Sequence, residues 1–359
     1  MNDILPFFKA LLSAPGVSGW EQPVFQLIEQ TWKPLVDEIS HSRLNSLHAF
    51  RKGTGKPPRP ALMVAAHMDS IGMIVTGIQN GLIRFSSIGG IDPRVLPGQF
   101  VRIHGSTVAS TLKESIPGVV VQPHPKLLPV EIRDEVIPME YLFIDTGLPT
   151  QTINKTIHMG DIISFDQHPI ELKGETIAGH SLDNRASIAA LTVCLQELKY
   201  CKHAWDLWMV GTVQEETGYI GANTSAFQLK PVMAVVVDVT WAKGPGTDDW
   251  NTFPLGKGIT VMMGPNMHPR MHRMVKDAAD RCEIPYEVEL TNARSGTDAF
   301  ATQVVGEGIP TVTIGIPIRY MHSPVEVGSI KDIYRAGRLL VEFICSLDHD
   351  SLKQLVLDQ

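Results

Sequence analysis

The stretch Leu207-Trp-Met-Val-Gly-Thr-Val-Gln-Glu-Glu-Thr-Gly218, LWMVGTVQEETG, joins an apolar run to two adjacent glutamates. The apolar part, residues 207–213, is typical of a strand buried on both faces. Two neighbouring carboxylates at the end of such a strand repel each other when both are ionised, and a nearby cation relieves this repulsion. A solvated turn is the alternative explanation for an isolated Glu-Glu pair. The rest of the chain decides between these two interpretations.

The overall composition is that of an ordinary globular protein. The chain has 359 residues, of which 43% are hydrophobic and 19% are charged, so it can bury a sizeable core and form more than one domain. Its net charge of -7 gives no general attraction to nucleic acid or to anionic membranes. We therefore expect neither nucleic acid nor a membrane as a partner.

The sequence also favours a cytoplasmic location. Its first residues show no basic segment followed by an apolar stretch, and the sequence contains no run of about 18 apolar residues. The cysteines lack the close pairs of a structural zinc site, and for Cys194 and Cys345, which lie in helical apolar patterns, we expect buried free thiols, in keeping with a reducing compartment. The cysteines are Cys194, Cys201, Cys282 and Cys345.

Strands and helices alternate over much of the chain. Continuous apolar runs predict buried strands at residues 61–66, 207–213, 232–237 and 311–316. Helical spacing of apolar residues predicts helices at residues 184–198, 271–282 and 330–347. This alternation predicts an α/β fold with a mostly parallel sheet flanked by helices.

The segment from residue 72 to residue 165 has a different texture. Short β-type runs at residues 82–85, 100–103, 118–122 and 161–165 are separated by glycine and proline turns. This pattern is typical of a small antiparallel or barrel-like domain. We therefore predict a catalytic domain built from residues 1–70 and 171–359, interrupted by a β-rich insert of residues 71–170.

Side chains that bind metals follow each of the predicted parallel strands. They are His67 with Asp69, Glu215 with Glu216, Asp238, and His322, joined by Asp183 just before a helix. Taken singly, each has an ordinary explanation as a core histidine, a helix cap or a turn residue. In open α/β sheets, however, ligands bind beyond the carboxyl ends of the strands. The joint placement of these residues at one sheet edge predicts a metal site.

The donor set indicates which ions the site takes. Two histidines and three carboxylates without a thiolate suit zinc, cobalt or manganese. Five ligands exceed what one tetrahedral zinc with an open position needs, and they suit two ions about 3.5–4 Å apart that share a carboxylate. Adjacent glutamates cannot point the same way, so one can bind metal while the other takes a proton from the water that the metal acidifies. Asp69 can hydrogen-bond the far nitrogen of His67 and fix its tautomer.

In this order, these residues resemble the M42 family of metallo-aminopeptidases, which includes the tetrahedral (TET) aminopeptidases. The resemblance covers essentially the whole chain, and the ordered set of motifs is far more specific than any single one. The motifs are Ala66-His-Met-Asp-Ser-Ile-Gly72, Ser181-Leu-Asp-Asn-Arg185, Gln214-Glu-Glu-Thr-Gly218, Val237-Asp-Val-Thr240, Ser295-Gly-Thr-Asp-Ala299 and Arg319-Tyr-Met-His-Ser-Pro-Val-Glu-Val327.

The resemblance implies a zinc-peptidase-like α/β/α catalytic domain that removes N-terminal residues from peptides with two divalent ions per chain, zinc first and cobalt or manganese as alternatives. It implies Glu215 as the general base and Asp69 as the orienting carboxylate. The implied metal ligands are His67, Asp183 as the bridge, Glu216, Asp238 and His322. It also implies that the insert mediates dimerisation. Many relatives assemble six dimers into a dodecamer, so we expect a homo-oligomer, from dimer to dodecamer.

Two positions depart from the family pattern. The family usually has Asp-Asp-Arg where this chain has Asp183-Asn184-Arg185, so a carboxylate next to the bridging residue is lost. The family usually has glutamate at the position of Ser70. The stretch Gly296-Thr-Asp-Ala299 is expected near the pocket for the first side chain of the substrate. Arg294 or Arg319 could favour acidic residues there, and each could equally make structural hydrogen bonds.

Other functions use similar residues. A two-metal deacylase or carboxypeptidase shares this core, and only the insert and the histidine-containing last motif favour an aminopeptidase. A glycosidase needs carboxylates that flank the scissile bond at about 5–9.5 Å rather than neighbours that compete for a metal. A binding module with a dead site would have lost a ligand or the base, whereas all are present here.

Overall fold

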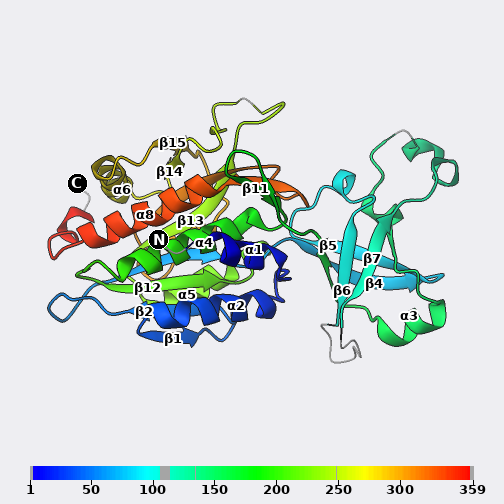
Figure 1. Ribbon diagram of the computed structural model, residues 1–359, viewed down its shortest axis with the longest axis horizontal. Helices are drawn as coiled ribbons and strands as arrows, with labels where there is room; N and C mark the ends of the chain where they lie inside the picture. The colour runs from blue at the N-terminus through cyan, green and yellow to red at the C-terminus, as the bar shows by residue number, and fades with distance from the viewer. Residues whose placement is uncertain (1–2, 106–113, 134, 248, 356–359) are drawn as a thin grey trace.

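The computed structural model describes residues 3–105, 114–133, 135–247 and 249–355. It consists of a large α/β unit and a smaller β-barrel beside it (Figure 1). Residues 106–113 and 134, which belong to the predicted insert, lie outside the described residues. Among the described helices, none combines the length and the apolar character that crossing a membrane requires.

The α/β unit is built on one 11-stranded sheet. Its strands are β1 (Glu38–His41), β2 (Leu47–Arg51), β3 (Ala61–His67), β10 (Ile170–Leu172), β11 (Thr176–Gly179), β12 (Asp206–Thr212), β13 (Met233–Trp241), β14 (Ile259–Met263), β15 (Tyr286–Leu290), β16 (Thr311–Arg319) and β17 (Glu326–Ser329).

The centre of this sheet is parallel and its flanks are antiparallel. Strands β12, β3, β13 and β16 pair in parallel, and they include all four runs predicted as buried strands. Strands β1 and β2 extend one side in antiparallel pairs, and β17, β11 and β10 extend the other. Strand β14 pairs with β16 and carries β15 outward. The predicted α/β class is confirmed, and the sheet is mixed, with its parallel pairs at the centre.

Helices cover both faces of the sheet. One face packs against α1 (Leu5–Ser13), α2 (Gln22–Trp32), α4 (Leu182–Leu198), α6 (Pro269–Arg281) and α8 (Ile330–Ser346), and the other against α5 (Ile220–Leu229) and α7 (Asp298–Gln303). Strand β3 shows why its apolar run is continuous. Leu62 and Val64 belong to the core of the first face, and Met63 and Ala65 belong to that of the second. Because successive side chains of a strand point to opposite faces, a strand covered twice needs apolar residues at every position.

Helices α4 and α8 lie directly against each other on the first face (Figure 1). Gly337 of α8 allows this approach, because a Cβ atom there would come within 2.7 Å of the carbonyl oxygen of Ala190 on α4. The close packing of α8 therefore fixes α4, and α4 begins beside Asp183.

The barrel comprises six strands closed in the order β4-β5-β8-β7-β6-β9. Their bounds are β4 (Gly72–Gln79), β5 (Leu82–Ile88), β6 (Phe100–His104), β7 (Ile116–Val121), β8 (Phe143–Asp145) and β9 (Ile162–Phe165), and helix α3 (Thr150–Thr156) packs beside them. The barrel has a hydrophobic core of its own, which includes Met73, Ile103 and Ile163. The predicted barrel-like insert is confirmed as a fold element.

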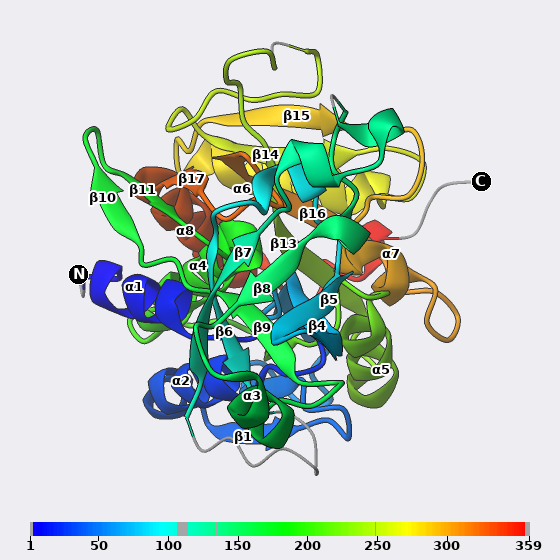
Figure 2. The same ribbon diagram turned by 90° about the vertical axis from the view of Figure 1, so that its right-hand side faces the viewer.

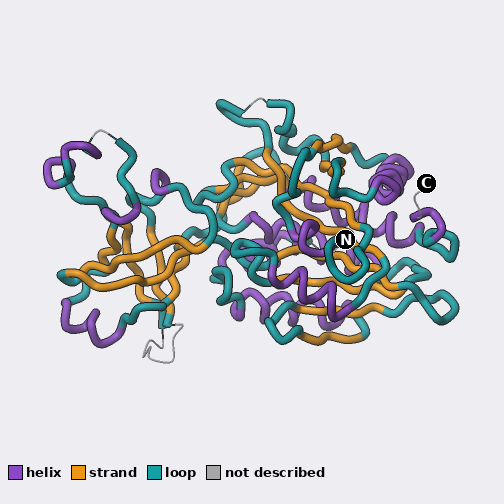
Figure 3. The backbone as a smooth tube through the Cα atoms, turned by 180° about the vertical axis from the view of Figure 1, so that it is seen from behind, coloured by secondary structure: helices purple, strands orange, loops and turns teal. Residues whose placement is uncertain are grey.

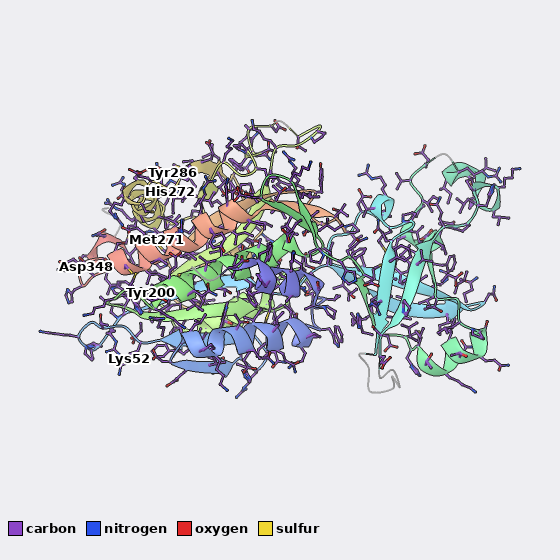
Figure 4. All side chains as sticks on the ribbon, in the orientation of Figure 1. Lys52, Tyr200, Met271, His272, Tyr286 and Asp348 are labelled. Carbon is purple, nitrogen blue, oxygen red and sulfur yellow. The ribbon has the colours of Figure 1, made fainter. Side chains whose placement is uncertain are left out.

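The barrel is attached at one end of the α/β unit. Seen from behind, it joins the rest of the molecule through a narrow set of chain segments (Figure 3). Lys52, Tyr200 and Asp348 lie at the opposite end of the α/β unit (Figure 4). Strand β3 leads to the barrel, since it ends at His67 and β4 begins at Gly72. The edge of the sheet that carries the predicted metal ligands therefore faces the barrel.

Candidate metal centre

The two ligand residues within central strands share one face of the sheet. His67 continues the row of Met63 and Ala65 on β3, and Asp238 continues the row of Val236 on β13. This is the face covered by α5 and α7. The helices cover the apolar part of each row, and the polar residue follows where the strand reaches the sheet edge.

A first group of possible ligands consists of His67, Asp183 and Asp238. Their ligand atoms all lie within 4.8 Å of one another. The Nε2 atom of His67 is 3.1 Å from Asp183 Oδ1 and 3.8 Å from Asp238 Oδ1. All three residues are buried, so the space between them is shielded from bulk water.

A second group consists of Asp183, Glu216 and His322, again with ligand atoms within 4.8 Å of one another. The Nε2 atom of His322 is 3.3 Å from Asp183 Oδ2 and 3.6 Å from Glu216 Oε2. The two carboxylate oxygens of Asp183 thus face different histidines, one from each group. Sharing of one carboxylate by two groups is compatible with a pair of metal ions.

Glu215 lies beside both groups and belongs to neither of them within the described part of the chain. Its Oε2 atom is 3.9 Å from His67 Nε2, and its side chain lines the same cavity as the ligands. The structure therefore separates the two adjacent glutamates, with Glu216 among the possible ligands and Glu215 next to them.

Asp69 holds the turn that carries both glutamates. Its Oδ1 atom accepts a hydrogen bond from the backbone N–H of Glu215 (3.1 Å), and its Oδ2 atom accepts one from the N–H of Glu216 (3.2 Å). The Oδ1 atom also lies 3.5 Å from His67 Nδ1, and the backbone oxygen of Asp69 lies 3.2 Å from the same nitrogen. Asp69 thus lies close to His67 and also fixes the backbone of the two glutamates.

The buried carboxylates disfavour one another's ionisation. Burial raises the pKa of Glu215 and of Asp238 well above the usual range, and nearby carboxylates raise both further. Burial, followed by the charge of Asp183, raises the pKa of Glu216 to about 8. The hydrogen bond to Asp183 raises the pKa of His322 to about 9 despite its partial burial. The cluster thus carries an excess of negative charge that it neutralises by holding protons or cations.

The geometry and the donor atoms of the site fit a divalent cation. The Oε1 atom of Glu216 is buried without a hydrogen-bond partner among the described residues. A buried carboxylate oxygen without a partner is costly, and a coordinated cation removes that cost. Imidazole and carboxylate donors suit zinc and other borderline or hard divalent ions.

Several segments that carry these residues adopt left-handed backbone conformations. Gln214 (φ 57°), Ser181 (φ 67°) and His322 (φ 60°) are not glycines, yet each has a positive φ. Such residues persist only where the surrounding structure holds them, and they concentrate at functional sites. The peptide bond between Asp183 and Asn184 is cis.

The two departures from the family pattern have visible environments. The side-chain amide of Asn184 donates a hydrogen bond to the carbonyl of Val237 (3.0 Å), a contact that an ionised aspartate could not make. The hydroxyl of Ser70 donates to the carbonyl of Gly16 (3.2 Å). Ser70 also lines a cavity of about 260 Å³ that Arg102 and His180 border.

Sequence reasoning gave no role to Glu326, which supports both ligand groups. Its carboxylate accepts hydrogen bonds from the backbone N–H of Asp183 (3.1 Å) and from that of His322 (3.0 Å). The side chain is only 1% exposed. Glu326 lies in the last family motif, so the motif was visible, but its partner Asp183 is 143 residues away and could not be inferred from spacing.

Asp298 is a second buried carboxylate whose function the sequence did not specify. It accepts a hydrogen bond from the hydroxyl of Thr212, and its Oδ1 atom has no partner among the described residues. Burial raises the pKa of Asp298 to about 6. Its position in the Ser295–Ala299 motif was the only signal in the sequence.

A cavity of about 410 Å³ opens in front of the ligand groups. Thr240, Trp241, Met262 and Glu289 line it beyond the ligands, and the loop of residues 295–297 completes the wall. The barrel side contributes Gly90, where a Cβ atom would lie 3.0 Å from His322 Nδ1. The cavity is therefore large enough for the end of a peptide.

Comparison with known proteins identifies the family. A family model described as M42 glutamyl aminopeptidase matches residues 46–339. The chain belongs to the M42 peptidase family. It is 33% identical to the lysyl aminopeptidase of Pyrococcus furiosus over 353 residues, which cover 95% of this chain and 97% of that protein.

Solved M42 structures share its fold over almost the whole chain. The TET aminopeptidase of the marine sediment archaeon Thaumarchaeota archaeon SCGC AB-539-E09 superimposes with a TM-score of 0.91 at 27% identity, covering 98% of this chain and 99% of that one. The TET1 peptidase of Pyrococcus horikoshii, which can assemble into a tetrahedron or a large octahedral shell, gives 0.82 at 27% identity, with 96% and 100% covered.

Membership of this family decides the reaction class. The M42 chain is an aminopeptidase, a hydrolase that removes N-terminal residues from peptides. Its site contains side chains that can bind divalent metal. The predicted function is confirmed over the deacylase and carboxypeptidase alternatives.

The support that Glu326 gives to Asp183 and His322 generates a prediction. Glu326→Ala removes the acceptor of two backbone N–H groups, so both ligand segments loosen and metal affinity falls about 10–100-fold. Glu326→Gln retains one carbonyl acceptor and should fall between this variant and the wild type. Titration of metal into the stripped protein against a competing chelator measures the effect. Glu287→Ala, an exposed glutamate elsewhere, is the control, and an unchanged affinity in Glu326→Ala would show that Glu326 is not needed.

Proposed function

We propose that this aminopeptidase is a two-metal enzyme in which Asp183 bridges the ions. One ion would be held by His67 and Asp238, and the other by Glu216 and His322. The observation that supports this most is the sharing of Asp183 by the two ligand groups, with one carboxylate oxygen toward each histidine. Zinc is the first choice for both positions, and cobalt or manganese suit the same donors.

Bound divalent ions supply two things in such a site, a water of lowered pKa and polarisation of the scissile carbonyl. The side chains of the chain itself do the rest. Glu215 lies beside the ligands with no place among them, so its carboxylate is available to take the proton of the attacking water. It can then deliver this proton to the leaving amine, because a positioned carboxyl group can act first as base and then as acid.

Asp69 has a positioning part in this proposal. Its carboxylate fixes the N–H groups of both glutamates and faces the far nitrogen of His67. It thereby holds the base and one ligand in a fixed relation, and such preorganisation contributes to the rate.

The two adjacent glutamates can be separated by experiment. Glu215→Gln should keep both ions and the fold and lose about 10²–10⁴-fold or more in kcat, because proton transfer is missing. Glu216→Gln should bind metal more weakly, and excess metal should restore part of its activity. Metal stoichiometry and kcat are measured together for both variants.

The opposite pattern, with Glu215→Gln shedding metal while Glu216→Gln keeps it, reverses the two roles. A loss of less than tenfold in kcat for both variants places the catalytic groups elsewhere.

The proposal includes the division of the chain and its assembly. Residues 1–70 and 171–359 would form the catalytic domain, and residues 71–170 a dimerisation domain. Within the insert, Phe100 is 63%, Leu127 79% and Val130 69% exposed, and exposed apolar side chains of this size are typical of interaction surfaces. Assembly would range from a dimer to a dodecamer, in line with the shells formed by the TET1 peptidase.

Light scattering at micromolar concentration tests the assembly. The wild type should be at least a dimer, and Leu127→Ser combined with Val130→Ser should shift it toward smaller species because apolar surface is removed from the insert. Lys155→Ser, also on the insert, serves as a control. A monomeric wild type with full activity would refute self-association as part of the function.

A cytoplasmic setting with peptide substrates completes the proposal. The described cysteines Cys194, Cys201, Cys282 and Cys345 are free thiols, as is usual in a reducing compartment. Neither nucleic acid nor a membrane has a place in it, because the chain carries a net charge of -7 and offers no general attraction to polyanions.

A further inference from the structure

The substrate cavity holds a carboxylate that belongs to neither ligand group. Five carboxylates line the cavity, namely Asp183, Glu215, Glu216, Asp238 and Glu289. Four of them are the proposed ligands and base. Glu289 comes from β15, an outer strand of the sheet, and has no part in the metal groups among the described residues.

We propose that Glu289 selects peptides whose first residue is lysine or arginine. Its carboxylate would receive the ammonium or guanidinium group of that residue inside the cavity. This inference rests on the proposed function, because it requires the N-terminus of a peptide to lie at the ligand groups. The inference adds the class of N-terminal side chain that the enzyme prefers. Family membership leaves this preference open, because the family model is described as a glutamyl aminopeptidase and the Pyrococcus furiosus relative is a lysyl aminopeptidase.

The structure holds Glu289 in place from two strands. Its Oε1 atom accepts a hydrogen bond from the hydroxyl of Thr240 (2.8 Å), and its Oε2 atom accepts one from the hydroxyl of Thr260 (2.6 Å). Because both oxygens are bonded, the carboxylate has a fixed orientation.

Gly315 makes this reach across the sheet possible. It pairs with Asp238 on one side and with Thr260 on the other. A Cβ atom at Gly315 would lie 2.1 Å from Thr260 Oγ1 and 3.0 Å from Glu289 Oε2, so a larger residue would push the network away. The absence of a side chain lets Glu289 lie on the face of the sheet that carries Asp238. Strands β14 and β15 lie in the upper part of the view from the barrel side (Figure 2).

The hydrogen-bond partners of Glu289 leave its charge unbalanced. Threonine hydroxyls are neutral donors, and within the described part of the chain no ion pair involves Glu289 and no lysine or arginine lines the cavity. Burial raises the pKa of Glu289, although the hydrogen bonds from Thr260 and Thr240 oppose this. A cation that enters the cavity would favour the ionised carboxylate and gain from a partly desolvated ion pair.

Each of the two arginines that could have favoured acidic substrates makes a contact outside the cavity. The guanidinium of Arg294 lies 4.8 Å from the ring centre of Phe300. The Nε atom of Arg319 donates to the backbone oxygen of Lys243 (2.7 Å). Neither side chain lines the cavity. The apolar walls Trp241 and Met262 suit the methylene stem of a long basic residue, whose charged end would then meet Glu289.

A purely structural role for Glu289 is the competing explanation, since it ties Thr240 on β13 to Thr260 on β14. The substitution Glu289→Gln separates the structural role from the specificity role. The glutamine side chain can still hydrogen-bond both hydroxyls, because a hydroxyl both donates and accepts, while the negative charge is lost. A structural role predicts equal effects on all substrates, and a specificity role predicts an effect only where the substrate carries a positive charge.

Lysine and norleucine form the matched pair of probes, because they share the straight apolar stem and only lysine has the ammonium group. The test compares kcat/KM for the chromogenic anilides of both residues in metal-loaded wild type and in Glu289→Gln. We expect the wild type to favour lysine at least tenfold, and Glu289→Gln to lower the lysine-to-norleucine ratio about 10–100-fold, mainly through KM. Glu287→Gln, the exposed glutamate two residues earlier on β15, should leave the ratio unchanged.

A binding measurement keeps this inference distinct from the proposed function. Calorimetry compares lysinamide with norleucinamide on the metal-loaded Glu215→Gln protein with and without Glu289→Gln. Tighter binding of lysinamide that depends on Glu289 supports the inference, whether or not the anilides are hydrolysed. A failure to hydrolyse any anilide would refute the proposed function and leave the inference standing. Equal binding of the two amides, a preference for glutamyl substrates, or an equal loss for all substrates in Glu289→Gln would overturn the inference.

Discussion

The constraint on which the site depends is the burial of several carboxylates at one edge of a sheet. Asp183 lies between His67 and His322, with Glu216 and Asp238 on either side of it. In the absence of metal ions, burial and the charge of Asp183 disfavour the ionisation of Glu216 and Asp238. The fold nevertheless holds them together, because the helices and the sheet that bring them to this edge are fixed by large apolar cores. Divalent ions turn an unfavourable cluster into a stable one, so bound metal would stabilise the fold as well as supply chemistry.

The surrounding residues convert this cluster into a defined geometry. Glu326 fastens the backbone of Asp183 to that of His322, although these two residues lie far apart in the sequence. Asp69 does the same for the backbones of Glu215 and Glu216. Both act through backbone N–H groups, so the positions of the reacting side chains depend on main-chain hydrogen bonds rather than on the mobile ends of side chains. The left-handed residues are held in a similar way, since the backbone N–H of His322 donates to Glu326 and that of Gln214 donates to the carboxylate of Glu21.

Much of this arrangement follows from local sequence signals. His67 and Asp238 were predictable because each ends a continuous apolar run, and parallel strands bring their carboxyl ends to one edge. The antiparallel flanks were not, because β10, β11 and β17 are short and only half-apolar. The roles of Glu326 and Glu289 could not be predicted either, since their partners are set by register and twist between distant strands. The role of Gly315 appears only when Asp238 and Thr260 are seen to pair with it from two sides.

The central claim is that one carboxylate, Asp183, is shared by two metal ions, and metal titration of the stripped protein tests it most directly. Titration of zinc, with the metal content of the purified protein measured in parallel, should show about two ions per chain. Asp183→Asn should weaken both binding steps, whereas Asp238→Asn should weaken chiefly one of them and His322→Gln chiefly the other. A single ion per chain in the fully active wild type would contradict the account. So would an Asp183→Asn protein in which one of two steps retains its full affinity.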